Sequence, residues 1–168
     1  WEIIHGNNPT LPVESLQKMM DAKLRQLEPL KYTADELAWA ATIRESLGDD
    51  APELAEAAQI EDYAVLTGYG STDVGDVSRA VPTVSVRTAT WVPGTSAHSW
   101  QAVAASGHSY GAKGTQHAAK AMMLAAVELY TNPRLRETAK AEFIAARGED
   151  YVYESLLGDR APPLDYRK

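Results

Sequence analysis

Histidine and aspartate side chains are the residues of this sequence that are best suited to bind a metal ion. Asp73 and Asp76 lie in the stretch GSTDVGDVSRAVPTVSV, and His98 lies in the loop GTSAHSWQAV that follows it. Imidazole and carboxylate groups are common zinc ligands. The other histidines are His5, His108 and His117. No two histidines are three or four residues apart, so a metal site would have to combine residues from separate segments.

Each of these residues also has a purely structural interpretation. His98 fits a polar residue of a loop rich in Gly, Ser and Thr, and Asp73 and Asp76 fit caps at a turn or a helix start. The stretch DVGD (73–76) lacks the alternating oxygen ligands of a calcium loop. The sequence also contains no H-E-x-x-H motif and no phosphate-binding glycine loop. Residue types alone leave the functional and the structural interpretations open.

The elements that would position these residues begin with helices. Residues 1–5 fit a short strand, and a loop follows over 6–12. The apolar positions Leu16, Met20, Leu24 and Leu27 step by four, four and three, which predicts a helix over 14–27. The sequence TADE (33–36) predicts a capping box, with a second helix running to about residue 47.

The second half of the sequence predicts a strand between helices. The segment PTVSVRTATWV (82–92) alternates Val84 and Val86 with polar residues and is rich in β-branched side chains. The segment AAKAMMLAAVEL (118–129) is apolar nearly all round, which predicts a helix buried on most sides against a sheet. A last helix is predicted over 132–148, with Pro133 at its first position. This mixture predicts an α/β fold, a sheet packed by helices.

Composition excludes several classes of partner. The chain has 168 residues and a net charge of -7, with no basic run that would bind phosphates, so we expect neither nucleic acid nor a membrane as a partner. It has no cysteine, which excludes disulfides and thiolate metal sites and fits a cytoplasmic protein. The sequence shows no apolar run of membrane-spanning length.

Three stretches in order carry a resemblance to a known family. They are GSTDVGDVSRAVPTVSV, GTSAHSWQAVAASG and HAAKAMMLAAVELY. This order resembles the C-terminal half of the zinc amidohydrolases and metallopeptidases related to aminoacylases and glutamate carboxypeptidases, especially those acting on p-aminobenzoyl-glutamate. The segments GNNPTLP, KYTADELAWA and PPLDY are similar to parts of the same enzymes. The resemblance implies that residues 1–6 end a lid-domain strand and its connection. Residues 7–168 would then be the C-terminal half of the catalytic domain.

The resemblance implies a site that this chain would share with other residues. In such enzymes two metal ions, zinc or manganese, activate water to cleave the amide of an N-acyl or aminobenzoyl amino acid or a small peptide. His98, in the loop at the end of the predicted strand, matches the metal-binding histidine of the C-terminal half, and His108 is its rival because GHS also looks like AHS. Ser71, Thr72, Asp73 and Gly75 match the turn beside the substrate, where Gly75 would permit close backbone approach. The general base and the other ligands would come from outside the chain, because it has no His-x-Asp and no Glu-Glu pair.

Two functional hypotheses follow. In the first, the chain is part of an amidohydrolase, inactive alone, that needs an N-terminal half or a second subunit. Its start at Trp1, with WEIIHG resembling a strand entered midway, favours a piece of a longer protein. In the second, the chain is a non-catalytic binding or assembly module that keeps the fold. If the chain is a piece of a longer protein, we expect an exposed apolar face or edge and a homo-oligomer.

Overall fold

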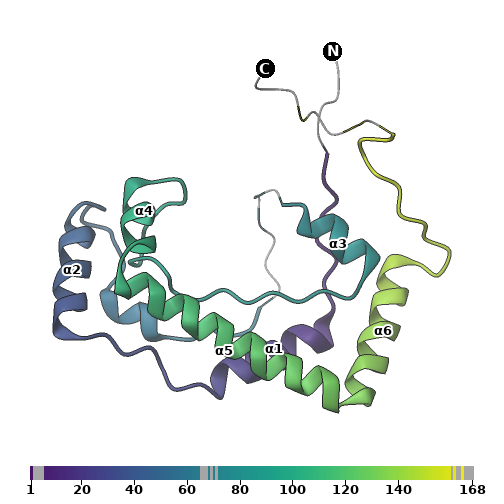
Figure 1. Cartoon of the computed structure of the whole chain (residues 1–168), viewed down its shortest axis with the longest axis horizontal. Coiled ribbons are helices and arrows are strands. Elements are labelled where there is room, and N and C mark those ends of the chain that lie inside the picture. The colour runs from purple at the N-terminus through teal and green to yellow at the C-terminus, as the bar shows by residue number, and fades with distance from the viewer. Residues whose placement is uncertain are drawn as a thin grey trace. The chain divides into compact units, whose positions relative to one another are not determined.

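The regular structure of this chain consists of helices. The computed structural model describes Trp1, 6–64, Gly68, Gly70, 72–159, Ala161 and Leu164. Within these residues there is no strand and no sheet, so the predicted α/β fold is wrong. The elements, shown in Figure 1, are α1 (Glu14–Arg25), α2 (Ala34–Glu45), the 3₁₀ helix η1 (Leu54–Ala58), α3 (Val74–Ala80), α4 (Trp100–Ser106), α5 (Ser109–Thr131) and α6 (Pro133–Arg147).

The segment predicted as the main strand, 82–92, has no regular secondary structure. Alternating β-branched residues form a strand only when a neighbouring chain offers its backbone groups, because β-propensity depends strongly on context. In the described part of the chain no ladder partner is present, and the segment packs on a helix instead. The Thr88 hydroxyl donates to the Gly114 carbonyl of α5 at 2.9 Å. The strand predicted over 1–5 lies largely outside the described residues.

Local sequence signals place α1 and α2 correctly. The helix predicted over 14–27 is α1, and Leu16 and Met20 on its predicted inner face are buried. The capping box of α2 is present: the Thr33 hydroxyl accepts from the Glu36 N–H at 3.2 Å, and the Glu36 carboxylate accepts from the Thr33 N–H at 2.7 Å. Such reciprocal bonds satisfy helix-start donors that have no partner within the helix.

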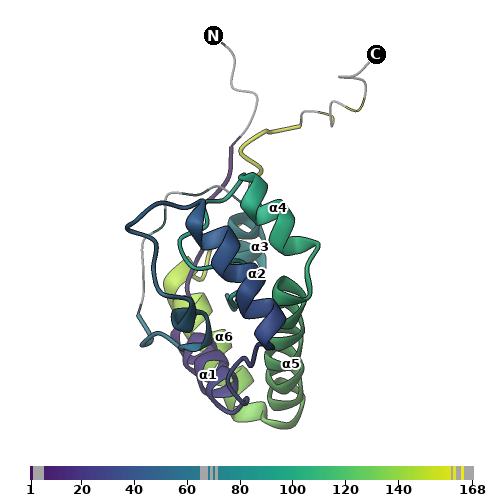
Figure 2. The same ribbon diagram turned by 90° about the vertical axis from the view of Figure 1, so that its left-hand side faces the viewer.

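The contacts within the chain divide it into two compact units. The first comprises Trp1–Gln17, Val65–Val84 and Arg134–Lys168, and the second comprises Lys18–Ala64 and Ser85–Pro133. In the second unit α5 contacts both α2 and α4, which Figure 2 shows from the side. Its core is a cluster of buried side chains, namely Ala40, Ile43, Ala57, Val92 and Tyr110.

In the first unit, hydrogen bonds link α3 to the stretch that precedes α1, and α6 to the first turn of α1. The Leu11 N–H donates to the fully buried Ser78 hydroxyl at 2.8 Å, and the Ser15 N–H donates to the Glu142 carboxylate at 2.9 Å. Pro133 begins α6 as predicted, and Ala139 and Phe143 of this helix are buried.

The helix predicted over 118–129 exists as part of α5, but the prediction that it is buried on most sides is wrong. Only Ala121 and Ala125 of that segment are buried, whereas Met122, Met123 and Val127 are exposed. The prediction required a sheet to cover the large apolar side chains, and the described residues form none. No described helix is both long enough and apolar enough to cross a membrane.

Candidate functional site

His98, the predicted metal ligand, lies in the second unit in the turn directly before α4. Its side chain is exposed, and its φ of 60° makes it the one non-glycine residue with a positive φ in the described part of the chain. This left-handed conformation costs a non-glycine residue about 1 kcal/mol or more, and such strained residues often mark functional sites. The predicted position of His98 at the end of a strand is wrong, because residues 82–92 form no strand.

The turn that holds His98 is fixed on its C-terminal side by Ser99. The Ser99 hydroxyl accepts from the Ala102 N–H at 3.2 Å, which caps α4, and donates to the Ser96 carbonyl at 2.7 Å. These two bonds define where the helix begins, and they leave the His98 imidazole outside it. Trp100, the first residue of α4, is 61% exposed.

The predicted substrate-binding turn belongs to the first unit. Ser71 lies outside the described residues. The Thr72 hydroxyl accepts from the Val74 N–H at 3.3 Å and lies 3.5 Å from an Asp73 carboxylate oxygen. Asp73 occupies the N-cap position of α3, but its side chain makes no capping bond. Its carboxylate is exposed and is not used to begin the helix.

Gly75 is required by packing rather than by any ligand that the structure shows. A Cβ atom at this position would lie 1.7 Å from the Asn8 carbonyl oxygen. The close backbone approach expected for Gly75 therefore occurs, and the approaching group is this chain's own backbone. The next residue, Asp76, accepts from the Asn8 side-chain amide at 2.6 Å and from the Tyr153 hydroxyl at 3.2 Å. The bond from Asn8 is the main cause that lowers the Asp76 pKa, so this carboxylate is a structural anchor.

A stack of aromatic residues in the second unit holds the other candidate histidine, His108. The ring centroids of Trp39 and His108 lie 4.1 Å apart, as do those of Tyr32 and Tyr110. The His108 Nδ1 atom accepts from the Tyr110 N–H at 3.1 Å and so caps α5. Because Nδ1 is an acceptor here, the proton of the neutral ring lies on Nε2. This bond occupies one of the two nitrogens that could bind a metal.

Beside this stack lies a buried carboxylate that sequence reasoning identified only as part of a capping box. Glu36 accepts from the Lys113 ammonium, which also donates to the Lys31 carbonyl at 2.8 Å. The bond from Lys113, with a second from the Thr33 N–H, lowers the Glu36 pKa to about 2. The nearby Tyr110 hydroxyl is buried and makes no hydrogen bond of good geometry within the described part of the chain; burial, followed by the neighbouring Tyr32, raises its pKa. The pairing of Glu36 with Lys113, 77 residues apart, leaves no local signal in the sequence.

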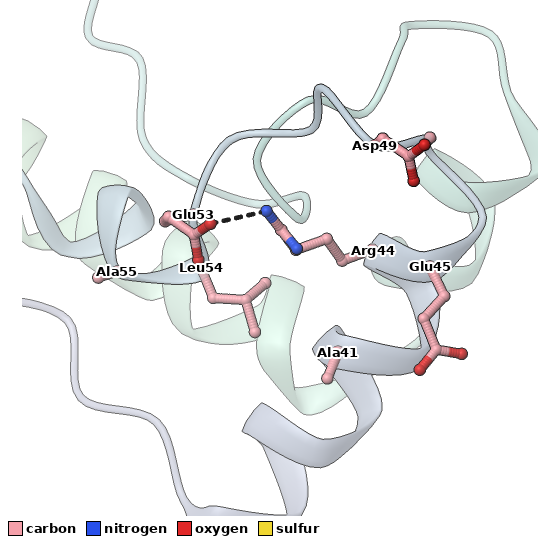
Figure 3. A pocket seen from close by; sticks show the side chains of 8 residues that line it. Ala41, Arg44, Glu45, Asp49, Glu53, Leu54 and Ala55 are labelled. Atoms are coloured by element: carbon pink, nitrogen blue, oxygen red, sulfur yellow. Dashed lines mark hydrogen bonds and ion pairs between the residues drawn. The ribbon is translucent and has the colours of Figure 1, made fainter.

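One hollow of the second unit, about 520 Å³ in volume, lies beside Arg44 between α2 and η1. Figure 3 shows the Arg44 guanidinium reaching across it to Glu53, with an N–O distance of 2.8 Å. The same guanidinium donates to the carbonyls of Pro52 and Ala51 at 2.8 and 2.7 Å. Three N–H donors of Arg44 are used in these bonds, so Arg44 acts as a structural clamp between α2 and the segment that leads into η1.

The described residues do not by themselves form a metal site. No group of three or more histidine, cysteine, aspartate or glutamate side chains within them could hold an ion. A catalytic zinc ion needs about three protein ligands, and His98 supplies one candidate. Comparison with protein-family models, with curated proteins and with solved structures finds no match for this chain.

Proposed function

We propose that this chain is one part of a metal-dependent amidohydrolase that cleaves the amide bond of an N-acyl or aminobenzoyl amino acid, with His98 as one metal ligand. The observation that carries the proposal is the conformation of His98. A solvent-exposed imidazole is held in a strained left-handed turn by the cap of the following helix. The reaction class comes from the resemblance of the ordered sequence stretches around His98 to the zinc amidohydrolases.

The other metal ligands and the general base would come from outside the described residues, in a further segment or a second subunit. Further ligands are required because the part of the chain that the structure describes contains no group of three ligands. In the complete enzyme Thr72, Asp73 and Gly75 would lie near the substrate. For Asp73 the support is a carboxylate that is exposed and makes no helix cap.

The test uses a tagged form of the chain purified from its own cells together with whatever binds it. The native assembly should hydrolyse p-aminobenzoyl-glutamate or an N-acyl amino acid, a chelator should remove the activity, and the isolated chain should have none. His98→Asn is the informative variant, because asparagine tolerates a positive φ but offers no imidazole. It should lower zinc content and rate together while the melting temperature stays unchanged. Unchanged metal content in His98→Asn would refute the ligand role.

The alternative function, an assembly module without catalysis, is favoured by one specific observation. Large apolar side chains are exposed along α5, among them Met123 at 66% and Tyr130 at 87%. Contiguous apolar surface of this kind commonly marks a protein interface. A native assembly that forms but shows no metal-dependent hydrolysis of any N-acyl amino acid would favour this function over the enzyme.

A further inference from the structure

A second hollow of the second unit, about 420 Å³ in volume, combines charged groups with an apolar wall. Its wall is formed by Leu24, Leu30 and Ile60, all of them half-buried. Arg87, Glu61 and His117 also line it, and we call it the Arg87 cleft after the cation among them. Ligand sites for small molecules are typically hollows of this size, mostly apolar, with a few polar groups.

Arg87 is the first notable group of the cleft. Its side chain is exposed, and within the described part of the chain its guanidinium makes no ion pair and no hydrogen bond. Arg44 in the neighbouring hollow, by contrast, donates to three acceptors. A free guanidinium presents five N–H donors in a planar fork that matches the two oxygens of a carboxylate.

Glu61 is the second notable group. The other carboxylates at the cleft are engaged: Asp21 accepts from Arg25 at 2.9 Å, and Glu56 accepts from the Glu53 N–H at 3.3 Å. The carboxylate of Glu61 has no such partner among the described residues, although its backbone carbonyl accepts from Arg25 at 2.8 Å. Arg87 and Glu61 thus line one hollow without forming an ion pair with each other. This arrangement suits a ligand that carries both charges.

His117 adds a polar group without adding charge. Burial, followed by the nearby Lys120, lowers the His117 pKa, so its imidazole is neutral near pH 7. A neutral imidazole can donate one hydrogen bond and accept another. Among the described residues, the cleft therefore combines one free cation, one free anion and one neutral hydrogen-bonding ring with an apolar wall.

We infer that the Arg87 cleft binds a small zwitterion, an α-amino acid with an apolar side chain. Arg87 would hold the carboxylate, Glu61 the ammonium group, and Leu24, Leu30 and Ile60 the side chain. The inference goes beyond the amidohydrolase proposal, since it involves no metal and none of the residues assigned to that site.

The experiment is a titration of the isotopically labelled 168-residue chain, followed by NMR chemical shifts, with L-leucine as the probe. For a ligand of this size in an open cleft, affinity in roughly the millimolar range is expected. L-leucine methyl ester lacks the carboxylate and N-acetyl-leucine lacks the ammonium group. Each should bind at least about tenfold more weakly than leucine. Glycine, which lacks the apolar side chain, should also bind more weakly.

Two variants separate the roles of the charges. Arg87→Gln should weaken the binding of leucine about tenfold or more but leave the binding of the methyl ester unchanged. Glu61→Gln should weaken the binding of leucine but not that of N-acetyl-leucine. Both residues are exposed, so the variants should fold, which the melting temperature checks. Arg134→Gln, an exposed arginine of the first unit, is the matched control and should change nothing. Equal binding of leucine and its two derivatives, or leucine binding that Arg87→Gln leaves intact, would overturn the inference without bearing on the amidohydrolase proposal.

Discussion

Replacing Gly114 with alanine should destabilise the second unit, although alanine is the better helix former. Gly111 and Gly114 lie one turn apart on α5, and both face the backbone of the segment 82–92, which we call the extended segment. A Cβ atom at Gly114 would lie 2.0 Å from the Ala89 carbonyl oxygen and 3.0 Å from the Thr90 nitrogen. Both neighbours are backbone atoms, so the contact can be relieved only by moving the helix or the segment.

The magnitude follows from three contributions. In an exposed helix, glycine to alanine stabilises by about 1 kcal/mol. Overpacking against backbone costs about 1–3 kcal/mol or more. Separating helix from segment also strains the 2.9 Å bond from the Thr88 hydroxyl to the Gly114 carbonyl, which contributes about 1 kcal/mol. Together these contributions lower the free energy of unfolding by about 1–3 kcal/mol.

The assay is urea unfolding followed by far-UV circular dichroism, with thermal melts in parallel. The melting temperature of Gly114→Ala should fall by roughly 3–10 °C. Gly107→Ala is the matched control, because its φ is -91° and the nearest atom to the new Cβ would be 3.8 Å away. It should be neutral or slightly stabilising. If Gly114→Ala proves as stable as the unmodified chain, the packing of α5 on the extended segment is not as described.

Three further predictions concern other contacts. Because Lys113 lowers the Glu36 pKa from 4.5 to about 2, the ionised carboxylate stabilises the fold above pH 4.5, and this contribution is lost as pH falls toward 2. The urea midpoint of Glu36→Gln should therefore vary less between pH 4.5 and pH 2 than that of the unmodified chain. Equal pH dependence of the two midpoints would contradict the pairing of Glu36 with Lys113. Tyr110→Phe removes a buried hydroxyl that has no hydrogen-bond partner among the described residues, so the melting temperature should stay equal or rise, whereas a clear fall would reveal a hydrogen bond. If the exposed side of α5 mediates self-association, light scattering should show a mass that rises with concentration and that Met123→Lys reduces, while a constant monomer mass would exclude the homo-oligomer.

Sequence reasoning succeeded where the signal is local. The capping box of Thr33 and Glu36 lies within four residues, and Pro133 marks a helix start through its own backbone geometry. It failed for 82–92, because a strand requires hydrogen bonds from a distant segment that the pattern itself does not reveal. The same error produced the wrong burial of 118–129, since a helix was expected to have a sheet beside it.

For the candidate sites too, the sequence predicts what depends on local signals and misses what depends on contacts between distant segments. The sequence singled out His98 by its loop, yet its positive φ could not be anticipated, since histidine seldom adopts one. Arg87, Glu61 and His117 cluster because the chain that follows η1, the segment 82–92 and α5 come together at the cleft, and nothing in the residue spacing signals it. For Gly75 the expectation of close backbone approach was physically sound, and only the identity of the approaching group needed the structure.

The discontinuous make-up of the first unit sets an order in which the molecule can fold during synthesis. Asp76 accepts hydrogen bonds from both Asn8 and Tyr153, so this junction needs residues separated by 68 and 77 positions. The second unit ends at Pro133, so all of it emerges from the ribosome before the rest of α6 and Tyr153 do. The second unit can therefore fold first, while Asn8 and Asp76 wait for Tyr153. Until then the first unit's apolar residues stay unprotected, which makes that interval the one most exposed to proteolysis and aggregation.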